Sequence, residues 1–294
     1  MPRLDPVRLV TIAGNTRQSG YIHHIRHLLA SLRQRGIKPA VERRFADYLI
    51  SQGIDIPADE ITDTPPPEAG AAISIGGDGT FLRTARWIGR TRTPVLGINT
   101  GHLGFLASYT PAETEAIADT LCNGAADVQE RMALRVDVGN ACSAPALPYA
   151  LNEVAILKDD TASMISVHVD LSGHYLADYL ADGLIISTPT GSTGYNLSAG
   201  GPIMFPELDA ICIAPVAPHS LTARPVVAAG GSIVAARTTA RTPHYRVSLD
   251  GVSFLMPARS TLTVTRADFS PRVIRLLDDS FAATLRHKLL WGVR

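Results

Sequence analysis

Three glycines surround a single aspartate in the first third of the chain. The segment runs from Gly76 to Gly79 with Asp78 inside it, and it follows the apolar residues 73–75. Glycine permits positive φ and lets backbone N–H groups converge on a phosphate. A carboxylate beside phosphates is repelled unless it binds a metal ion or takes a proton from an attacking hydroxyl. The segment therefore predicts phosphoryl transfer to an alcohol, with Gly76, Gly77 and Gly79 as the phosphate loop and Asp78 as the general base.

Two common phosphate-binding patterns do not fit this segment. It has no GxxxxGK[ST] sequence, and Leu82 stands where the dinucleotide fingerprint has its third glycine. An ordinary strand-to-helix turn with Asp78 as the N-cap is an alternative interpretation. Arg83 follows roughly one turn into the expected helix, where it either neutralises phosphate charge or faces solvent.

A second polar segment, residues 182–202, is rich in hydroxyls and glycines. The apolar residues 184–186 open into a series of serines and threonines with one aromatic residue, Tyr195. Such a segment offers many donors and acceptors, so it suits a polyhydroxylated ligand or a phosphate. A loop without a ligand is the alternative, which the segment's length and its aromatic residue disfavour.

Together with two further blocks, these segments resemble the NAD kinase family, within the superfamily that also includes diacylglycerol kinases and phosphofructokinases. The resemblance covers most of the chain and rests on four ordered blocks: Gly76-Gly77-Asp78-Gly79, Gly97-Ile98-Asn99 running to Gly101-His102-Leu103-Gly104-Phe105-Leu106, the pair Asn152-Glu153, and the run from Asp182 to Gly201. It implies transfer of the terminal phosphate of ATP, or of another phosphate donor, to the 2′-hydroxyl of the adenosine ribose of NAD, giving NADP. A divalent cation, Mg²⁺ in the first place, is implied as cofactor.

The resemblance also implies which residues bind the substrates. Asp78 corresponds to the proton acceptor, and Glu153 can accept hydrogen bonds from ribose hydroxyls while Tyr195 supplies a flat face or a hydroxyl. The implied NAD contacts are Asp78, Gly79, Asn152, Glu153, Asp182, Thr193, Gly194, Tyr195, Asn196, Leu197, Ser198 and Ala217, with Arg83 as a candidate phosphate ligand.

Two positions depart from the family's pattern. Gly194 stands where many members have alanine, and Val252 follows Asp250-Gly251 where a glutamine is common. The first departure is expected to loosen the loop. The second puts one polar NAD contact in doubt, but not the activity.

The elements that must position these residues fall into two classes. In the first half, apolar strands at 7–13, 71–75 and 94–98 alternate with amphipathic helices at 19–35 and from Thr80 onward. This βαβ alternation predicts a parallel, Rossmann-like sheet covered by helices.

From about residue 126 the apolar period changes to two, as in 132–138 and 165–171, and Asp250-Gly251 is a hairpin-turn signal. Many short strands with frequent turns predict a β-sandwich. We expect an α/β domain of residues 1–125 plus about 271–294 and a β-sandwich NAD-binding domain of residues 126–270. The apolar stretch 273–277 and a last helix, capped by Asp279 or Ser280, are expected to return to the first domain.

Composition excludes several kinds of partner. The chain of 294 residues has 27 Lys+Arg and 27 Asp+Glu, so no global field attracts nucleic acid or an anionic membrane. Its three cysteines lack a CxxC spacing, and no apolar run approaches the roughly 20 residues of a membrane span. A cytoplasmic protein with NAD and ATP as small-molecule partners is therefore expected, and the family resemblance adds a homodimer or homotetramer.

Two other functions are alternatives to an NAD kinase. A lipid kinase of the same superfamily would share the glycine-rich loop, although Asn152-Glu153 and the hydroxyl-rich segment favour a polar acceptor. A non-catalytic sensor of NAD or NADP is the second, although it would gain nothing from an acid beside phosphate. Polyphosphate as donor, acceptance of NADH and inhibition by NADPH stay open. His23 and His27, at i,i+4 spacing but without an accompanying acid, are interpreted as a solvated helix face.

Overall fold

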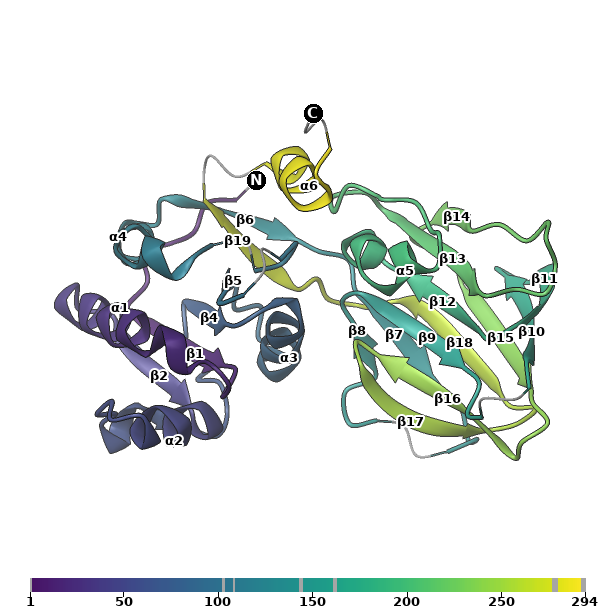
Figure 1. Ribbon diagram of the computed structural model, residues 1–294, viewed down its shortest axis with the longest axis horizontal. Helices are drawn as coiled ribbons and strands as arrows, with labels where there is room; N and C mark the ends of the chain where they lie inside the picture. The colour runs from purple at the N-terminus through teal and green to yellow at the C-terminus, as the bar shows by residue number, and fades with distance from the viewer. Residues whose placement is uncertain are drawn as a thin grey trace. The chain divides into compact units, whose positions relative to one another are not determined.

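The computed structural model describes residues 2–101, 104–107, 109–142, 145–160, 163–276 and 280–291. The chain divides into two compact units (Figure 1). Unit 1 consists of Met1–Glu130 and Pro271–Arg294, and unit 2 consists of Arg131–Ser270. Within the described ranges, no helix is long and apolar enough to cross a membrane.

Unit 1 is built on a seven-stranded sheet. Its order is β3-β2-β1-β4-β5-β19-β6, and the pairs from β3 through β19 are parallel, whereas β6 is antiparallel to β19. The strands are β1 (Leu9–Gly14), β2 (Lys38–Glu42), β3 (Ile61–Thr62), β4 (Ala71–Ile75), β5 (Val95–Ile98), β6 (Ala126–Glu130) and β19 (Arg272–Leu276). The central strands β1 and β4 are buried along most of their length, as parallel strands covered on both faces must be.

Unit 1 also contains five α-helices among its described residues. They are α1 (Ile22–Gln34), α2 (Arg43–Ser51), α3 (Asp78–Ile88), α4 (Thr114–Asn123) and α6 (Phe281–Leu289), with 3₁₀ turns at Ser19–Tyr21, Ala58–Glu60 and Pro111–Glu113. The buried residues of α1 include Ile25, Leu28, Leu29 and Leu32, which recur at the i, i+3, i+4, i+7 spacing of one helix face. This apolar face packs into the main core of unit 1.

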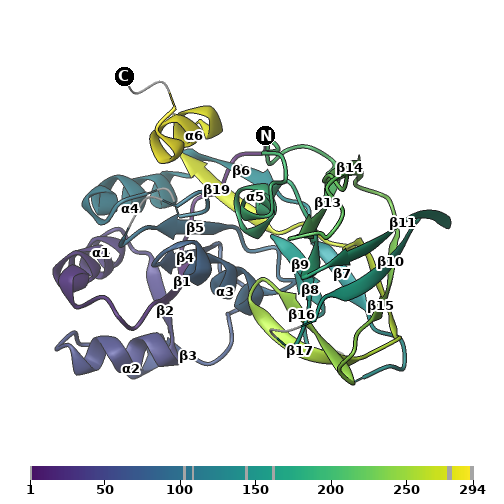
Figure 2. The same cartoon turned by 45° about the vertical axis from the view of Figure 1, so that its right-hand side comes forward.

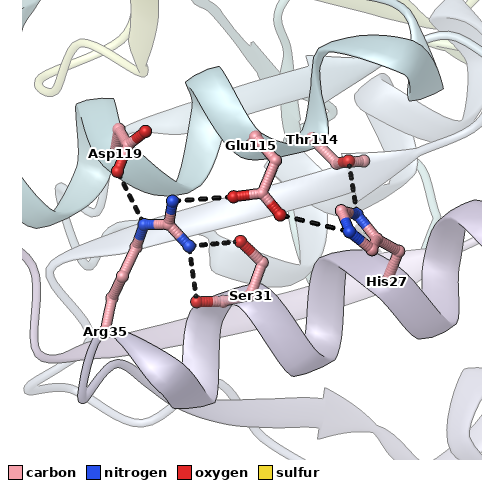
Figure 3. A network of polar contacts seen from close by, with 6 residues as sticks. All are labelled: His27, Ser31, Arg35, Thr114, Glu115 and Asp119. Carbon is pink, nitrogen blue, oxygen red and sulfur yellow. Dashed lines mark hydrogen bonds and ion pairs between the residues drawn. The ribbon is translucent and has the colours of Figure 1, made fainter.

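Helices α1 and α4 lie side by side in both ribbon views (Figures 1 and 2) and are joined by a polar network (Figure 3). The guanidinium of Arg35 contacts Glu115 and Asp119, each at 2.7 Å. His27 reaches the same glutamate at 3.2 Å and Thr114 Oγ1 at 3.2 Å. His27, Glu115 and Asp119 are at least half exposed, whereas Arg35, which joins the two carboxylates, is 21% exposed. The exposed ion pairs add little stability by themselves.

Unit 2 consists of two six-stranded antiparallel sheets. One has the order β11-β10-β15-β18-β7-β8 and the other β14-β13-β12-β9-β16-β17. The first contains β7 (Leu134–Asp137), β8 (Tyr149–Ala150), β10 (Ile165–Leu171), β11 (His174–Ala181), β15 (Val234–Thr239) and β18 (Thr261–Arg266). The second contains β9 (Glu153–Leu157), β12 (Gly183–Ser187), β13 (Ala210–Val216), β14 (Val226–Ala229), β16 (His244–Leu249) and β17 (Val252–Pro257).

The core of unit 2 collects apolar residues from both sheets. In β10 the residues Ile165, Val167 and Val169 are buried, and in β16 Val247 and Leu249 are buried, so each strand turns alternate side chains inward. A 3₁₀ turn, η4 (Thr190–Thr193), and a one-turn helix, α5 (Tyr195–Ser198), follow β12.

The expected fold class is confirmed, because an α/β unit with a parallel sheet precedes a β-sandwich and α6 belongs to unit 1. The hairpin turn is also confirmed: Asp250 and Gly251 have φ of 50° and 85° and join β16 to β17. Ser280 is the N-cap position of α6, whereas Asp279 lies outside the described residues. Helix α3 begins at Asp78 rather than at Thr80.

The strands that begin near residue 126 belong to two different units. The first strand, β6, pairs with β19 in unit 1, and the sandwich starts only at Arg131. Alternation of apolar residues reports a half-buried strand, but it does not say which sheet the strand joins.

Candidate functional site

The glycine-rich segment lies between β4 and α3, at the carboxyl end of the parallel sheet, where open α/β sheets bind their ligands. Gly76 has φ of +153°, and a Cβ there would lie 2.3 Å from Thr80 Oγ1, so only glycine fits. Its N–H donates to Ile98 O at 2.8 Å. Of the predicted phosphate loop, Gly76 thus ties the segment to β5, whereas Gly77 and Gly79 have open space where a Cβ would be.

Asp78 is the first residue of α3, and Gly77 holds the N-cap position. Its carboxylate accepts three hydrogen bonds from consecutive backbone N–H groups, those of Phe105 (2.9 Å, to Oδ2), Leu106 (3.0 Å, to Oδ1) and Ala107 (3.0 Å, to Oδ1). A Cβ at Gly104 would lie 2.0 Å from Oδ1, so that glycine is what admits the carboxylate. The alternative that Asp78 is the N-cap is therefore wrong, because the carboxylate binds a different segment.

A carboxylate has about four lone-pair positions for acceptance. The backbone donors to Asp78 occupy both positions of Oδ1 and one of Oδ2. One position on Oδ2 is left for a further donor, such as a hydroxyl group. Sequence reasoning placed 101–106 only as a family block and missed that Phe105–Ala107 holds the aspartate; of that block, His102 and Leu103 lie outside the described residues.

Arg83 has protein partners. Its Nη1 lies 2.8 Å and 3.0 Å from the two carboxylate oxygens of Glu42, and its Nη2 donates to the carbonyl of Gly14. These contacts join α3 to the ends of β1 and β2, and the side chain of Arg83 remains 34% exposed. Its role as a phosphate ligand stays a prediction.

Two further residues support the carboxyl edge of the sheet and carry no signal in the sequence. Gln18 is buried, and its Nε2 donates to Ile75 O at 2.8 Å, directly before the glycine segment. Lys288 on α6 places Nζ 3.7 Å from Asp78 Oδ2 and 4.3 Å from the centroid of the Phe105 ring. Both contacts join residues far apart in the chain, so residue spacing cannot reveal them.

In unit 2, Asn152 and Glu153 stand at the start of β9. Their backbone N–H groups donate to Asp250 Oδ1 at 2.8 and 3.2 Å, and that of Leu151 donates to Oδ2 at 2.7 Å. Asp250 occupies the first position of the β16–β17 turn with positive φ. The hairpin therefore fixes the orientation of the Asn152-Glu153 pair.

The carboxyl group of Glu153 is strongly perturbed. Burial raises its pKa to about 7, and the charge of Asp250 adds to the increase, while a backbone hydrogen bond from Tyr195 opposes it. Among the described residues, Glu153 Oε2, Asn152 Oδ1 and Asn196 Oδ1 are buried without a hydrogen-bond partner. Unpaired buried acceptors are costly, so the adjacent pair Asn152-Glu153 is suited to a ligand that donates hydrogen bonds.

Some polar groups of the segment after β12 form hydrogen bonds within the protein. Thr188 Oγ1 donates to Leu151 O at 2.6 Å, and the hydroxyl of Ser192 bonds both the carbonyl and the N–H of Met204. Gly194 lies against Glu153, since a Cβ there would be 3.2 Å from Oε2. Tyr195 is 38% exposed, so its ring is accessible to a ligand. The structure thus brings the segment from Thr193 to Ser198 close to Asn152-Glu153.

Asp182 and Ala217 lie elsewhere in unit 2. The register of β9 with β12 pairs Glu153 with Ser187 but Leu157 with Gly183. Asp182 therefore stands about 16 Å from the Glu153 end of the strand pair, at about 3.3 Å per residue. There it forms an ion pair of 2.7 Å with Lys158, and its N–H bonds Val216 O, directly before Ala217. Within this unit, the predicted NAD contacts thus form two separate clusters.

Comparison with protein families and known proteins agrees with this division into two parts. The model of the ATP-NAD kinase N-terminal domain matches residues 27–126, and that of the ATP-NAD kinase C-terminal domain matches residues 151–276. The NAD kinase of Bacteroides fragilis is 42% identical over 285 residues, which is 96% of this chain and 97% of the relative. The NAD kinase of Porphyromonas gingivalis is 41% identical over 288 residues, covering 97% and 99% of the two chains.

Solved structures share the fold. A yeast NADH kinase complexed with NADH matches with a TM-score of 0.86 and 22% identity, over 99% of this chain and 89% of that one. An NAD kinase from Archaeoglobus fulgidus in complex with ATP matches with a TM-score of 0.74 and 24% identity, over 96% and 98%.

Proposed function

The chain belongs to the NAD kinase family, and we propose that it transfers the terminal phosphate of ATP to the 2′-hydroxyl of the adenosine ribose of NAD, giving NADP. The resemblance noted in the sequence is thereby confirmed. The observation that supports the chemistry is the state of Asp78, whose carboxylate is held by three backbone donors and keeps one acceptor position on Oδ2.

Asp78 acts on the acceptor hydroxyl in this proposal. Its Oδ2 accepts the hydrogen bond of the 2′-hydroxyl, orients the oxygen toward the terminal phosphorus and takes the proton as the new bond forms. Because the Phe105–Ala107 backbone fixes the carboxylate, little reorganisation is needed at the moment of reaction. Gly77 and Gly79, at the start of α3, leave the space for a phosphate beside the helix N-terminus.

Glu153 and Asn152 bind the NAD. Ribose hydroxyls and the adenine amino group are donors, and they meet the unpaired buried acceptors Glu153 Oε2, Asn152 Oδ1 and Asn196 Oδ1. Tyr195 offers an exposed ring for stacking. These roles favour a nucleoside over a lipid acceptor, because an apolar acceptor would leave the same oxygens unpaired.

A divalent cation fits this donor set through the substrate. Among the described residues, no group of three or more His, Cys, Asp or Glu side chains is placed to hold a metal ion. Mg²⁺ is usually held by substrate phosphates and water with at most one or two carboxylates. Because the acceptor hydroxyl takes the one open position of Asp78 Oδ2, the phosphates of ATP would hold the cation here. When bound, Mg²⁺ neutralises charge on the transferred phosphate.

The decisive experiment incubates the purified protein with ATP, Mg²⁺ and NAD, and measures NADP with an NADP-specific dehydrogenase. The wild type is expected to form NADP. Asp78→Asn is expected to bind NAD, measured by calorimetry, but to form almost none. A folded wild type that binds NAD and forms no NADP would favour a sensor of NAD or NADP over a kinase.

The Asp78→Asn variant needs a stability control. The amide Nδ2 of asparagine carries hydrogens and cannot accept, so whichever oxygen it replaces, at least one backbone N–H group of Phe105–Ala107 loses its acceptor. One donor is then left unpaired, which costs about 1–3 kcal/mol. Thermal unfolding of the variant is therefore measured beside its activity. A cytoplasmic location and a homodimer or homotetramer complete the proposal, and sedimentation of the purified protein tests the oligomer.

A further inference from the structure

Lys288 lies beside Asp78, although the two residues belong to the two separate chain segments of unit 1. The sequence of α6 explains the direction of its side chain. Lys288 follows Thr284 by four positions and Leu285 by three, and both of these residues are buried, so it shares their inward face. Arg286, two positions before it, is exposed. The placement of Lys288 thus follows from helix periodicity.

The ammonium group of Lys288 does not complete its hydrogen bonds with Asp78. The separation of 3.7 Å between Nζ and Oδ2 exceeds a hydrogen bond, and the ring of Phe105 at 4.3 Å offers a cation–π contact. The ammonium has three donors to give. The ammonium thus lies near Oδ2, the oxygen with the open acceptor position, and its N–H groups remain available for a ligand.

Packing of α6 does not depend on this amine. Phe281 lies 6.3 Å from Phe105, centroid to centroid, and Leu285 is buried. These contacts already hold the helix against the segment that binds Asp78. The amine is therefore free to serve the chemistry.

We propose that Lys288 is a catalytic residue whose ammonium contacts the transferred phosphoryl group while the acceptor hydroxyl lies on Asp78 Oδ2. This inference rests on the proposed kinase function. A bond forms between the hydroxyl oxygen and the terminal phosphorus, and the bond from that phosphorus to the bridging oxygen of ATP breaks. ADP keeps the electron pair, and the hydroxyl proton passes to Oδ2. The negative charge on the phosphoryl oxygens develops next to a carboxylate, and Lys288 offsets that repulsion.

The test compares Lys288→Met with Arg286→Met, which removes one positive charge from the exposed face of the same helix. Lys288→Met is expected to lower kcat about a hundred-fold or more, the typical effect of removing one charge-stabilising donor. The KM for NAD should change less than three-fold, because the residue acts on the phosphoryl group. Arg286→Met should keep wild-type kcat. Equal melting temperatures of the two variants exclude a merely structural effect.

A chemical rescue keeps the test valid if Lys288→Met loosens α6. Lys288→Cys is treated with 2-bromoethylamine, which rebuilds an amine at nearly the same position, and the wild type receives the same treatment as control for its three cysteines. Recovery of at least ten-fold in kcat is expected. A Lys288→Met variant with kcat within three-fold of wild type, or a treated Lys288→Cys without recovery, would overturn the inference. Absence of NADP formation by the wild type would instead overturn the kinase function itself.

Discussion

Replacement of Glu153 by glutamine should make the protein more stable at alkaline pH while weakening the binding of NAD. The folded state raises the pKa of Glu153 from 4.5 to about 7, chiefly by burial. Between these two values the folded state binds more protons than the unfolded state, so stability falls as pH rises and levels off above pH 7. Glutamine keeps the shape of the protonated acid and has no charge to bury.

The magnitude follows from the shift. Each pKa unit corresponds to about 1.4 kcal/mol, so the full change from below pH 4.5 to above pH 7 is about 3 kcal/mol. About 2 kcal/mol of this is expected between pH 5.5 and pH 8. The advantage of Glu153→Gln over wild type should therefore increase by about 2 kcal/mol across that interval.

Urea unfolding at a series of pH values, followed by far-UV circular dichroism, is the suitable assay. The two tryptophans, Trp87 and Trp291, both belong to unit 1, so their fluorescence does not report the sheets around Glu153. Calorimetric titration with NAD measures the loss of binding in parallel.

The reasoning would be refuted if the difference in unfolding free energy between wild type and Glu153→Gln stayed constant from pH 5.5 to pH 8. If the stability advantage of Glu153→Gln increased as pH fell, the reasoning would also be refuted, because the Glu153 carboxylate would then stabilise the fold. Unchanged NAD affinity would separately exclude Glu153 as a ligand of the ribose.

Other substitutions test the remaining contacts. Asp250→Asn removes the charge that helps to raise the pKa of Glu153, so the midpoint of the pH-dependent stability should move to lower pH in the same urea assay. Gly104→Ala places a methyl group 2.0 Å from Asp78 Oδ1, so NADP formation should fall more than a hundred-fold. Gly77→Ala has open space at its Cβ, so thermal unfolding should show a stable fold. Arg83→Met leaves Glu42 without its partner and should destabilise unit 1 by about 2 kcal/mol, measured by Trp87 fluorescence. The KM for ATP should change less than three-fold. A large increase in that KM would favour Arg83 as a phosphate ligand.

The fold could be predicted from the sequence because it depends on repeated patterns. The spacing of apolar residues in α1 and the alternation in β10 each report burial of one face, and they identify helix and strand directly. The turn at Asp250-Gly251 follows from the need for two residues with positive φ. The sheet that β6 joins does not follow from its own residues, because a half-buried strand looks the same in either sheet.

The site could be predicted only in part. Asp78 and Asn152-Glu153 are recognisable from residue types in ordered blocks, but the atoms that hold them are backbone N–H groups, which every residue except proline possesses. No side chain marks Phe105–Ala107 as the partner of Asp78; the available signal is Gly104, whose missing side chain leaves room for the carboxylate. Arg83 carries the right charge for a phosphate, yet its partner Glu42 lies on a different element and cannot be inferred from spacing.

Two aspartates in this chain are bound in the same way, and the comparison shows what distinguishes a base. Asp78 and Asp250 each accept three consecutive backbone N–H groups, with two on one oxygen and one on the other. Hydrogen bonding alone therefore does not identify the reactive group. Asp250 lies beside a second carboxylate, Glu153, whose pKa it raises. Asp78 instead lies 3.7 Å from the ammonium of Lys288. A phosphoryl group can approach a carboxylate beside a cation far more easily than one beside another carboxylate. The neighbouring charge, more than the aspartate itself, makes Asp78 suited to phosphoryl transfer and Asp250 to holding a binding residue in place.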